Sequence, residues 1–347
     1  MKILVRATNW VGDAVMSIPA LQAIRGRWPR ADMAILARPP VAELYRGQGY
    51  ADRLFVFEHT GCHRGVWGRE RMASELRRER FDVALLLQNA FEAAWIASRA
   101  RIPVRIGYDC DARGFLLTRA VDVPRPGEVP AHETYYYLEL LRRAGWIERL
   151  PAVEFIEIRV VSDALARAEE MLRQAGAREG VFRVALAPGA AYGSAKCWPA
   201  ERFAALAGRL IAEFDADVIL FGTASERVVA EKISAAMRHR PVMLVGDTSV
   251  GDLPALLGCC QLFIGNDSGA MHVAAAVGLP VVGIFGPTDP VGTAPVTPRF
   301  ALVRQPVSCS PCFLRHCPVD HRCMTRIDVD AVHAVARGWM ARSARSV

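Results

Sequence analysis

Short apolar runs alternate with segments of helical periodicity along this chain. The first run, residues 3–7, leads through a polar loop into apolar positions spaced as on one face of a helix, from Val15 to Ile24. Further apolar runs at 33–37, 83–87 and 105–107 are separated by helical patterns. Such alternation predicts βαβ units and therefore a parallel sheet whose strands are joined by helices.

A second series of the same kind follows a Pro-rich stretch at 123–130 and a helical segment at 132–144. Its expected strands are 183–187, 217–221, 243–245, 262–265 and 281–285, and its expected helices are 201–214, 225–238, 253–257 and 271–277. The 347 residues suffice for two domains. The sequence therefore predicts two doubly wound α/β domains, residues 1–165 and 166–347, with the boundary in the polar segment 159–180. A last helix at about 329–342 could pack back on the first domain.

Composition narrows the class of protein. Hydrophobic residues make up 52% and charged residues 23% of the chain, which excludes a disordered segment. No apolar stretch reaches the roughly 20 residues of a membrane-spanning helix. The charge at Arg6 interrupts the first apolar run too early for a signal peptide. We therefore expect a cytoplasmic protein.

The formal net charge is +7, made up of +5 in residues 1–160 and +2 in the remainder. The excess in the front half indicates either an anionic partner for that half or simply a basic protein, because net charge affects association and not fold. A nucleic acid is disfavoured as the partner, since no basic run is interleaved with aromatic residues.

The nine cysteines are expected to be mostly reduced thiols in a cytoplasmic chain. Four of them fall within fifteen residues, together with His316 and His321: Cys309, Cys312, Cys317 and Cys323. That density raises a structural zinc site as one possibility. A second Cys-x-x-Cys pair is missing, so a thiol-rich loop without metal is the favoured interpretation, and no cofactor is expected.

Ligands of open parallel sheets bind beyond the carboxyl ends of the strands, where helices begin. The residues Asp267, Ser268 and Gly269 occupy such a position, and His272 follows on the same helical face as Ser268. Free N–H groups at this helix start would suit a phosphate. The simpler alternative is that Asp267 or Ser268 only caps the helix, and these residues alone leave both interpretations open.

Other expected strand ends also carry polar residues. Small residues at 188–195 would let backbone N–H groups approach an anion next to Lys196, although the phosphate-loop signature is absent and a turn-rich linker is the alternative. Glu226 could accept hydrogen bonds from ribose hydroxyls or could simply begin a helix. In the first half, Asp13 stands at a helix N-terminus, which should lower its pKa and keep it ionised as a base, unless it is a plain N-cap.

Four segments together resemble glycosyltransferase family 9: residues 9–13, 196–199, 266–272 and 285–290. The segment 309–324 is similar to the tail of the subgroup that adds the second heptose of lipopolysaccharide, so the resemblance covers nearly the whole chain. It implies the GT-B architecture, in which two Rossmann-like domains face each other. The N-terminal domain would bind the acceptor and the C-terminal domain the nucleotide sugar.

The activity that this resemblance implies is the transfer of L-glycero-D-manno-heptose from ADP-heptose to the first heptose of the lipid A-core acceptor. The transfer would invert the anomeric configuration and would need no metal, because a helix N-terminus and one lysine can stabilise a diphosphate leaving group. The acceptor would lie at the inner membrane, where attraction between the basic front half and anionic head groups would give peripheral attachment.

The resemblance also implies roles for single residues. Asp13 would be the general base that takes a proton from the acceptor hydroxyl. The implied donor-binding residues are Tyr192, Lys196, Glu226, Thr248, Asp267, Ser268, Gly269 and His272. Among these, Lys196 would lie beside the diphosphate, Asp267 near the sugar, Glu226 at the ribose and Thr248 at the adenine. Cys197 and Ala270 depart from the family pattern, which bears on fine specificity and not on reaction type.

Several alternatives stay open at this point. A sibling transferase could add the first heptose or use another nucleotide sugar, and assays with different donors and acceptors would separate it. A nucleotide-sugar-binding protein without activity is disfavoured because Asp13 and Lys196 are both retained. A Rossmann oxidoreductase is disfavoured because residues 8–13 contain no Gly-x-Gly-x-x-Gly.

Overall fold

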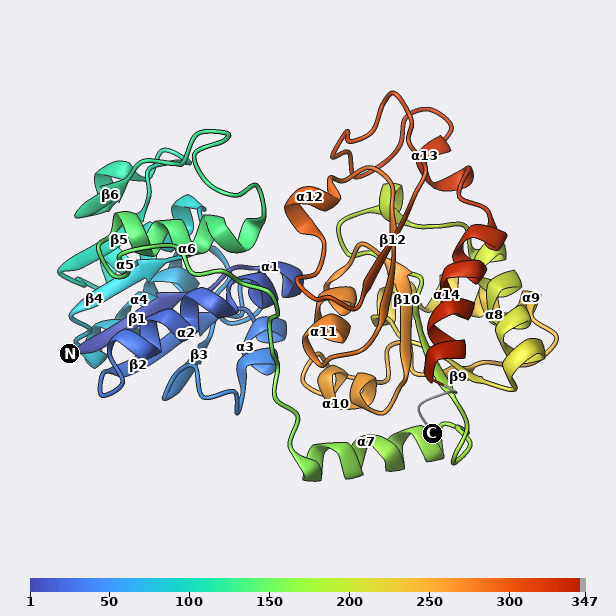
Figure 1. Ribbon diagram of the computed structural model, residues 1–347. Helices are drawn as coiled ribbons and strands as arrows, with labels where there is room; N and C mark the ends of the chain where they lie inside the picture. Colours follow the sequence, from blue (N-terminus) through green and yellow to red (C-terminus); the bar gives the residue numbers. More distant parts are fainter. Residues whose placement is uncertain (344–347) are drawn as a thin grey trace. The chain divides into compact units, whose positions relative to one another are not determined.

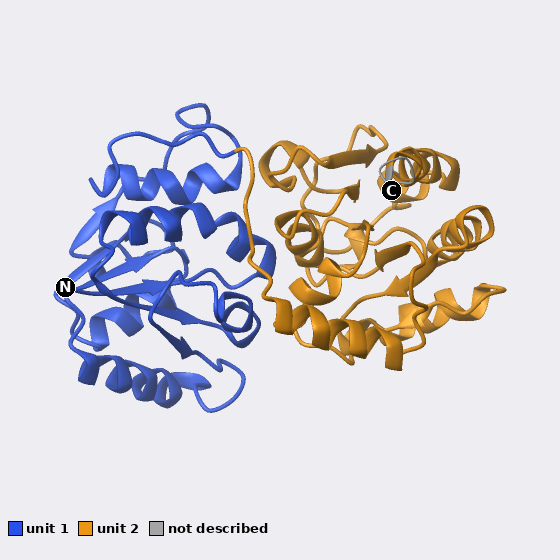
Figure 2. Cartoon of the chain, turned by 60° about the horizontal axis from the view of Figure 1, so that its bottom comes forward, with its two compact units in different colours: residues 1–153 blue, residues 154–347 orange. Residues whose placement is uncertain are grey.

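A computed structural model describes residues 1–343 and divides the chain into two compact units, Met1–Val153 and Glu154–Val347 (Figure 2). The division lies ahead of the expected boundary at residue 165. The segment 159–180, expected as a polar boundary, contains helix α7 (Ser162–Gln174) of the second unit. That helix is mostly polar because only a narrow stripe, Ala168 and Leu172, is buried, and it packs on α10 (Leu253–Gly258).

The first unit is a six-stranded parallel sheet in the order β3-β2-β1-β4-β5-β6 (Figure 1). Its strands are β1 (Lys2–Arg6), β2 (Asp32–Ala37), β3 (Arg53–Val56), β4 (Val83–Leu86), β5 (Val104–Tyr108) and β6 (Arg119–Val121). Its helices are α1 (Val11–Met16), α2 (Ile18–Arg27), α3 (Pro39–Tyr45), α4 (Gly65–Glu79), α5 (Phe91–Arg99) and α6 (Glu133–Arg143), with the 3-10 turn η1 (Gly114–Leu116). Buried residues of α4 and α5 pack together over β1, β2 and β4.

The second unit repeats this architecture, with the strand order β12-β11-β10-β7-β8-β9 and every neighbouring pair parallel. Its strands are β7 (Arg183–Ala187), β8 (Asp217–Leu220), β9 (Val242–Met243), β10 (Leu262–Asn266), β11 (Val281–Phe285) and β12 (Phe300–Arg304). Besides α7 and α10, its helices are α8 (Ala200–Phe214), α9 (Arg227–Ala236), α11 (Gly269–Ala276), α12 (Pro290–Thr293), α13 (Arg322–Thr325) and α14 (Val329–Ser343), with the 3-10 turns η2 (Ser194–Lys196) and η3 (Ala224–Glu226).

The core of the second unit follows from helical spacing. Phe203, Leu206, Ala207 and Leu210 recur at intervals of three and four residues along α8, so they form one buried face. That face packs with α9 and α14 in one apolar cluster with the sheet (Figure 1). Helix α14 packs on α8 and beside β10, β11 and β12 of its own unit. Its expected packing on the first unit stays a prediction.

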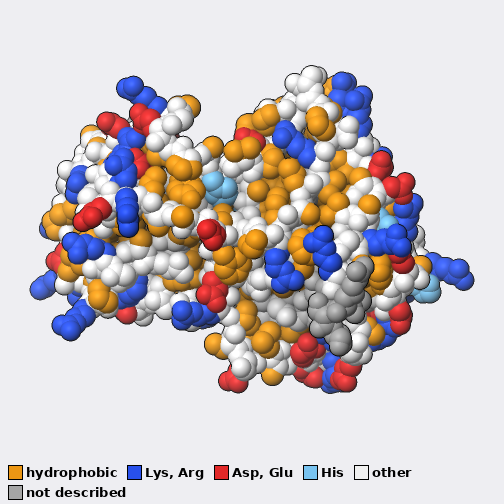
Figure 3. Space-filling model, in the orientation of Figure 1, with side chains coloured by type: hydrophobic (Ala, Val, Ile, Leu, Met, Phe, Trp, Pro, Cys, Tyr) orange, Lys and Arg blue, Asp and Glu red, His pale blue; other side chains and the backbone are white. Residues whose placement is uncertain are grey.

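The predicted fold class is confirmed, because both units are parallel sheets joined by helices. Strands β3, β6 and β12 escaped prediction. All three lie at sheet edges, are largely half-exposed or exposed, and include a charged residue, so their apolar signal is weak. On the face shown in Figure 3, Lys and Arg side chains are scattered over both units. No helix within residues 1–343 is long and apolar enough to cross a bilayer.

Candidate active site

The strand order reverses in the middle of each sheet, between β1 and β4 in the first unit and between β7 and β10 in the second. In open parallel sheets, ligands bind at such reversal points, beyond the carboxyl ends of the strands. In the second unit, the residues at this point are the loop 188–196 after β7 and the residues that follow β10. The candidate residues Lys196, Asp267 and Ser268 therefore follow the two strands that flank the reversal.

Lys196 and Asp267, which are far apart in the chain, form a buried ion pair at this reversal point. The Lys196 ammonium donates to Asp267 Oδ2 at 2.6 Å, and only 13% and 5% of the two side chains are exposed. The Thr288 hydroxyl donates to the same oxygen at 2.7 Å. The lysine charge is thus already balanced by a carboxylate, and an anion that approached Lys196 would have to replace Asp267 as its partner.

The start of α11 lacks the side-chain cap that the simpler interpretation required. Ser268 is the N-cap residue, but its side chain makes no capping hydrogen bond. Its hydroxyl oxygen is buried and has no hydrogen-bond partner in the described chain. Asp267 bonds to Lys196 and Thr288 instead. The first N–H groups of an eight-residue helix therefore remain available at half-exposed residues, including Gly269, as phosphate binding requires. His272 lies buried one turn further along α11.

Asn266, the last residue of β10, connects the two loops; it lies in the segment 266–272 that carries the family resemblance, but the sequence did not predict this role. Its amide nitrogen donates to the Pro188 carbonyl at 2.6 Å, and its side-chain oxygen accepts from the Trp198 N–H at 3.0 Å. The side chain is fully buried. A polar residue at the end of an otherwise apolar strand was the available signal.

Glu226 occupies the helix-start position that the simpler interpretation gave it. One carboxylate oxygen, Oε2, accepts from the Thr223 N–H at 2.6 Å in a capping box. The carboxylate also lies against the loop after β7, because a Cβ added at Gly189 would fall 1.8 Å from Glu226 Oε1. Glu226 therefore caps η3 and at the same time borders the loop that leads to Lys196.

Thr248 lies in the turn after β9. Its hydroxyl donates weakly to the Leu244 carbonyl at 3.5 Å. The Gly246 N–H donates to the Gly222 carbonyl at 2.9 Å, which ties this turn to the loop that carries Glu226. The structure therefore brings the loops of Glu226 and Thr248 side by side.

The segment 305–321, here called the thiol-rich loop, packs on the loop of Lys196. The Tyr192 hydroxyl donates to the Phe313 carbonyl at 2.6 Å, and the Ala195 N–H donates to the Arg315 carbonyl at 3.0 Å. The Lys196 ammonium and the Arg315 guanidinium lie 4.9 and 5.3 Å from the centre of the Tyr192 ring. Sequence analysis did not foresee these contacts.

The cysteines of this region are free thiols, exposed at positions 309, 312 and 317 and buried at 323. Cys317 Sγ accepts from the His321 N–H at 3.3 Å. His321 Nε2 lies 2.6 Å from the Ala195 carbonyl oxygen and is thus engaged with the Lys196 loop. Within residues 1–343, no three Cys, His, Asp or Glu side chains form a group that could hold a metal ion.

Asp13 lies just after β1, at the reversal point of the first sheet. It is the third residue of α1, whose N-cap is Trp10, so Asp13 is not the N-cap. Its negative charge raises the pKa of the buried Tyr137, after the larger effect of burial. Thr8 Oγ1 and Gln88 Oε1, which follow the adjacent strands β1 and β4, are both buried and without hydrogen-bond partners in the described chain. This edge therefore combines a carboxylate with unsatisfied polar atoms.

Known proteins of similar sequence and structure share this two-unit architecture and indicate the family of the chain. The family model described as glycosyltransferase family 9 (heptosyltransferase) matches residues 69–322. Lipooligosaccharide heptosyltransferase 2 of Haemophilus influenzae is 30% identical over 315 residues, and lipopolysaccharide heptosyltransferase 2 of Salmonella typhimurium is 30% identical over 319 residues; each match covers 88% of both chains. The solved structure of ADP-heptose LPS heptosyltransferase II from Escherichia coli matches with a TM-score of 0.83 at 26% identity, over 99% of each chain.

Proposed function

This chain belongs to glycosyltransferase family 9, and on that premise we propose that it transfers L-glycero-D-manno-heptose from ADP-heptose to the first heptose of the lipopolysaccharide inner core. Enzymes named heptosyltransferase 2 are among its relatives over most of its length, which supports this step of core synthesis. The structural observation that carries the proposal is the uncapped start of α11 beside the Lys196–Asp267 ion pair. Together they form a site for a diphosphate that bears a sugar.

The donor binds to the second unit by exchanging ionic partners. The diphosphate accepts hydrogen bonds from the N–H groups of Ser268 and Gly269 and draws Lys196 away from Asp267. The released Asp267 carboxylate then accepts a hydrogen bond from a hydroxyl of the heptose. Lys196 and Asp267 are both buried, so separating them would be costly if either charge were left without a partner. In this exchange the diphosphate becomes the partner of the lysine, and the sugar hydroxyl becomes the partner of the aspartate.

The nucleoside part of the donor lies along the neighbouring strand ends. Glu226 has one carboxylate oxygen, Oε2, engaged in its capping box, while Oε1 faces Gly189 and accepts from a ribose hydroxyl. The turn of Thr248 borders the adenine. Tyr192, with its ring against Lys196, keeps the ammonium directed at the phosphates. His272 supports the same helix start from one turn further along α11.

Transfer then proceeds by direct displacement. The Asp13 carboxylate takes the proton of the acceptor hydroxyl while that oxygen attacks the anomeric carbon. The bond between the anomeric carbon and the diphosphate oxygen breaks, ADP leaves with the electron pair, and the configuration inverts. The helix N-terminus and Lys196 stabilise the charge that develops on the leaving group, so no divalent metal is required.

We further infer that the acceptor reaches the enzyme at the cytoplasmic face of the inner membrane, where the protein attaches peripherally. The positive excess in residues 1–160 favours attraction to anionic lipids. The Trp67 and Val66 side chains at the start of α4 are 86% and 63% exposed, next to Arg64 and Arg69, and such a pairing of aromatic and basic groups suits a membrane interface.

An assay with purified protein tests the function. ADP-heptose is offered with core acceptors that carry no heptose, one heptose or two heptoses, and the product is analysed by mass spectrometry and by NMR of the new anomeric centre. We expect transfer only to the acceptor with one heptose, with inverted configuration. Transfer to the heptose-free acceptor would identify the sibling activity that adds the first heptose. Retention of configuration would contradict the role of Asp13.

A further inference from the structure

Four basic side chains gather at the carboxyl edge of the first sheet, around a single carboxylate. Arg6 is the last residue of β1, Arg38 directly follows β2, and His59 follows β3. These three strands are adjacent and in parallel register, so the residues that follow them share one edge. Arg69 of α4 and Glu92 of α5 complete this set, here called the basic cluster. Asp13 lies after β1 at the same edge.

The charges in the basic cluster do not balance. Glu92 is already paired, since its Oε2 accepts from Arg69 Nε at 2.5 Å. Arg6 is 1% exposed and donates to neutral groups: the Ala7 and Leu36 carbonyls, and the Asn9 side chain at 3.0 Å. Its guanidinium is therefore hydrogen-bonded but has no carboxylate partner of its own.

Arg38 and His59 are the unsatisfied members of the cluster. Within residues 1–343 the Arg38 side chain makes no hydrogen bond or ion pair, and its Nε is buried. His59 Nδ1 is also buried without a partner. Burial lowers the pKa of Arg38, lowers that of Arg6 to about 9, and lowers that of His59, which the charge of Arg38 lowers further. The charge of Glu92 raises the pKa of all three groups, but its carboxylate is already bound to Arg69. Positive charge here therefore exceeds its counterion in a poorly solvated place, which costs free energy.

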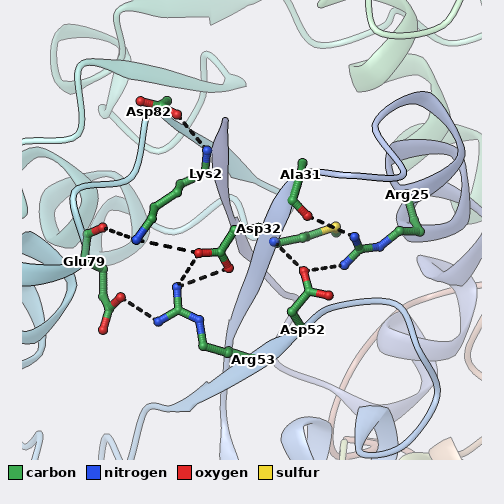
Figure 4. Close-up of polar contacts among 9 residues, drawn as sticks. Lys2, Arg25, Ala31, Asp32, Asp52, Arg53, Glu79 and Asp82 are labelled. Atoms are coloured by element: carbon green, nitrogen blue, oxygen red, sulfur yellow. Dashed lines mark hydrogen bonds and ion pairs between the residues drawn. The ribbon is translucent and has the colours of Figure 1, made fainter.

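At the amino edge of the same sheet, two arginines are paired with carboxylates. In Figure 4, Arg53 pairs with Asp32 at 3.0 Å and with Glu79 at 2.5 Å, and Arg25 pairs with Asp52 at 2.8 Å. Each of these guanidinium groups has a carboxylate partner. Elsewhere in this unit the buried Arg113 has no carboxylate partner but donates to the Tyr108 and Gln88 carbonyls. Arg38 differs from both cases, because within residues 1–343 its side chain has neither a carboxylate nor a carbonyl partner and can therefore bind an anion from outside the chain.

We propose that Arg38 and His59, backed by the field of Arg6, bind an anionic substituent of the sugar acceptor, a phosphate or a carboxylate. The proposal rests on the proposed function, because it assigns the anion to the acceptor. Arg38 and His59 are half-buried, so they can touch a ligand, whereas Arg6 is enclosed and acts as a positioning residue. Guanidinium groups bind both kinds of oxyanion in two-point geometry. Because the cluster shares its edge with Asp13, the anchored acceptor presents its hydroxyl to the base.

The test compares wild type with Arg38→Ala, with Arg38→Lys and with the control Arg71→Ala. Arg71 lies on α4 outside the cluster, with its side chain 66% exposed and paired to Glu75. Affinity for the deacylated acceptor with one heptose is measured by calorimetry, and the Michaelis constants of both substrates are measured by turnover. We expect Arg38→Ala to weaken acceptor binding by about 10- to 100-fold, Arg38→Lys to restore part of it, and the donor constant to stay unchanged. The control should match wild type.

Two treated acceptors identify the anion. If phosphatase treatment weakens binding to wild type and removes the difference between wild type and Arg38→Ala, the anion is a phosphate. If reduction of the carboxyl groups does so instead, it is a carboxylate. The proposal is overturned if Arg38→Ala binds the untreated acceptor as wild type does, or if its deficit persists against both treated acceptors.

A separate arm distinguishes failure of this site from failure of the proposed function. Inorganic phosphate should raise the melting temperature of wild type more than that of Arg38→Ala. If wild type neither binds nor glycosylates the acceptor but keeps this Arg38-dependent shift, the anion site stands and its assignment to the acceptor is wrong. Equal shifts in both proteins would overturn the anion site itself.

Discussion

The two units share one strand order but differ in how their charged side chains beyond the strand ends are paired. In the second unit, Lys196, Asp267 and Thr288 satisfy one another and both ends of the Asn266 amide are bonded, so that only the Ser268 hydroxyl among these described groups lacks a partner. In the first unit, Thr8 Oγ1 and Gln88 Oε1 have no partner among the described residues, and the Arg38 guanidinium is unpaired. The topology thus sets the position of both candidate sites, whereas the pairing of their side chains determines which groups of each site lack a partner.

This difference has a physical consequence for binding. The proposed donor would have to replace Asp267 as the partner of Lys196, so the net gain at this ion pair would be smaller than the new contact suggests. The proposed acceptor would supply partners to groups of the first unit that have none among the described residues, so each such contact would remove an existing penalty. The variants below break or sharpen this contrast, in order of decreasing effect.

Replacement of the base in the first unit should have the largest effect. Asp13→Asn keeps the shape of the side chain but removes the proton acceptor, so we expect kcat to fall by about 10²- to 10⁴-fold. The affinity for ADP, measured by calorimetry, should not change because the donor residues belong to the second unit. Glu75→Gln on the surface of α4 is the control. A variant that keeps more than about a tenth of wild-type kcat would place the base elsewhere.

Removal of the lysine tests the exchange of partners in the second unit. Lys196→Ala should weaken ADP and ADP-heptose alike by about 10- to 100-fold, the range of charge-assisted hydrogen bonds. It also leaves the buried Asp267 without its cation, so the melting temperature should fall as well. Lys232→Ala, on the exposed side of α9, is the matched control. Unchanged ADP affinity in Lys196→Ala would remove this lysine from the diphosphate site.

Separation of the thiol-rich loop from the Lys196 loop should have a smaller effect. A Cβ at Gly193 would lie 2.3 Å from the Arg315 carbonyl oxygen, and two backbones cannot easily move apart. Gly193→Ala should therefore destabilise the second unit by about 1–3 kcal/mol and weaken the hydrogen bond from the Tyr192 hydroxyl to the Phe313 carbonyl. Gly208→Ala is the control, because a Cβ there meets nothing within 4 Å on helix α8. Chemical denaturation followed by Trp fluorescence compares each variant with wild type. A Gly193→Ala variant as stable as wild type would show that the thiol-rich loop can move away from residue 193 without cost.

Removal of metal should have no effect. In the proposed mechanism Lys196 and the start of α11 stabilise the leaving diphosphate, so EDTA should leave the rate of heptose transfer unchanged. Elemental analysis of untagged protein accompanies the assay and reports on the four clustered cysteines. If EDTA abolishes the rate and Mg²⁺ restores it while the melting temperature stays constant, the metal-free mechanism is wrong.

The sequence predicted the interior of both sheets well, because buried strands such as β7 and β11 are uninterrupted apolar runs whose ends are visible in the chain. It failed at the sheet edges, where β6 exposes two of its three residues. At the candidate site, it located the residues that follow each strand, since that rule depends on topology alone. It could not foresee the Lys196–Asp267 pair, the uncapped Ser268 or the unpaired Arg38, because these depend on which side chains meet across long stretches of chain.

The contact between the thiol-rich loop and the Lys196 loop limits when the second unit can be completed during synthesis of the chain. Tyr192 and Phe313, joined by a hydrogen bond, are 121 residues apart in sequence. All residues of the first unit, 1–153, are synthesised long before residue 313, so this unit can assemble first. The loop of Lys196 must wait for that late segment, and α14, which packs beside β10, is made later still. A nascent chain halted before β12 would therefore hold a complete first unit, while the Lys196 loop would still lack its contacts with the thiol-rich loop.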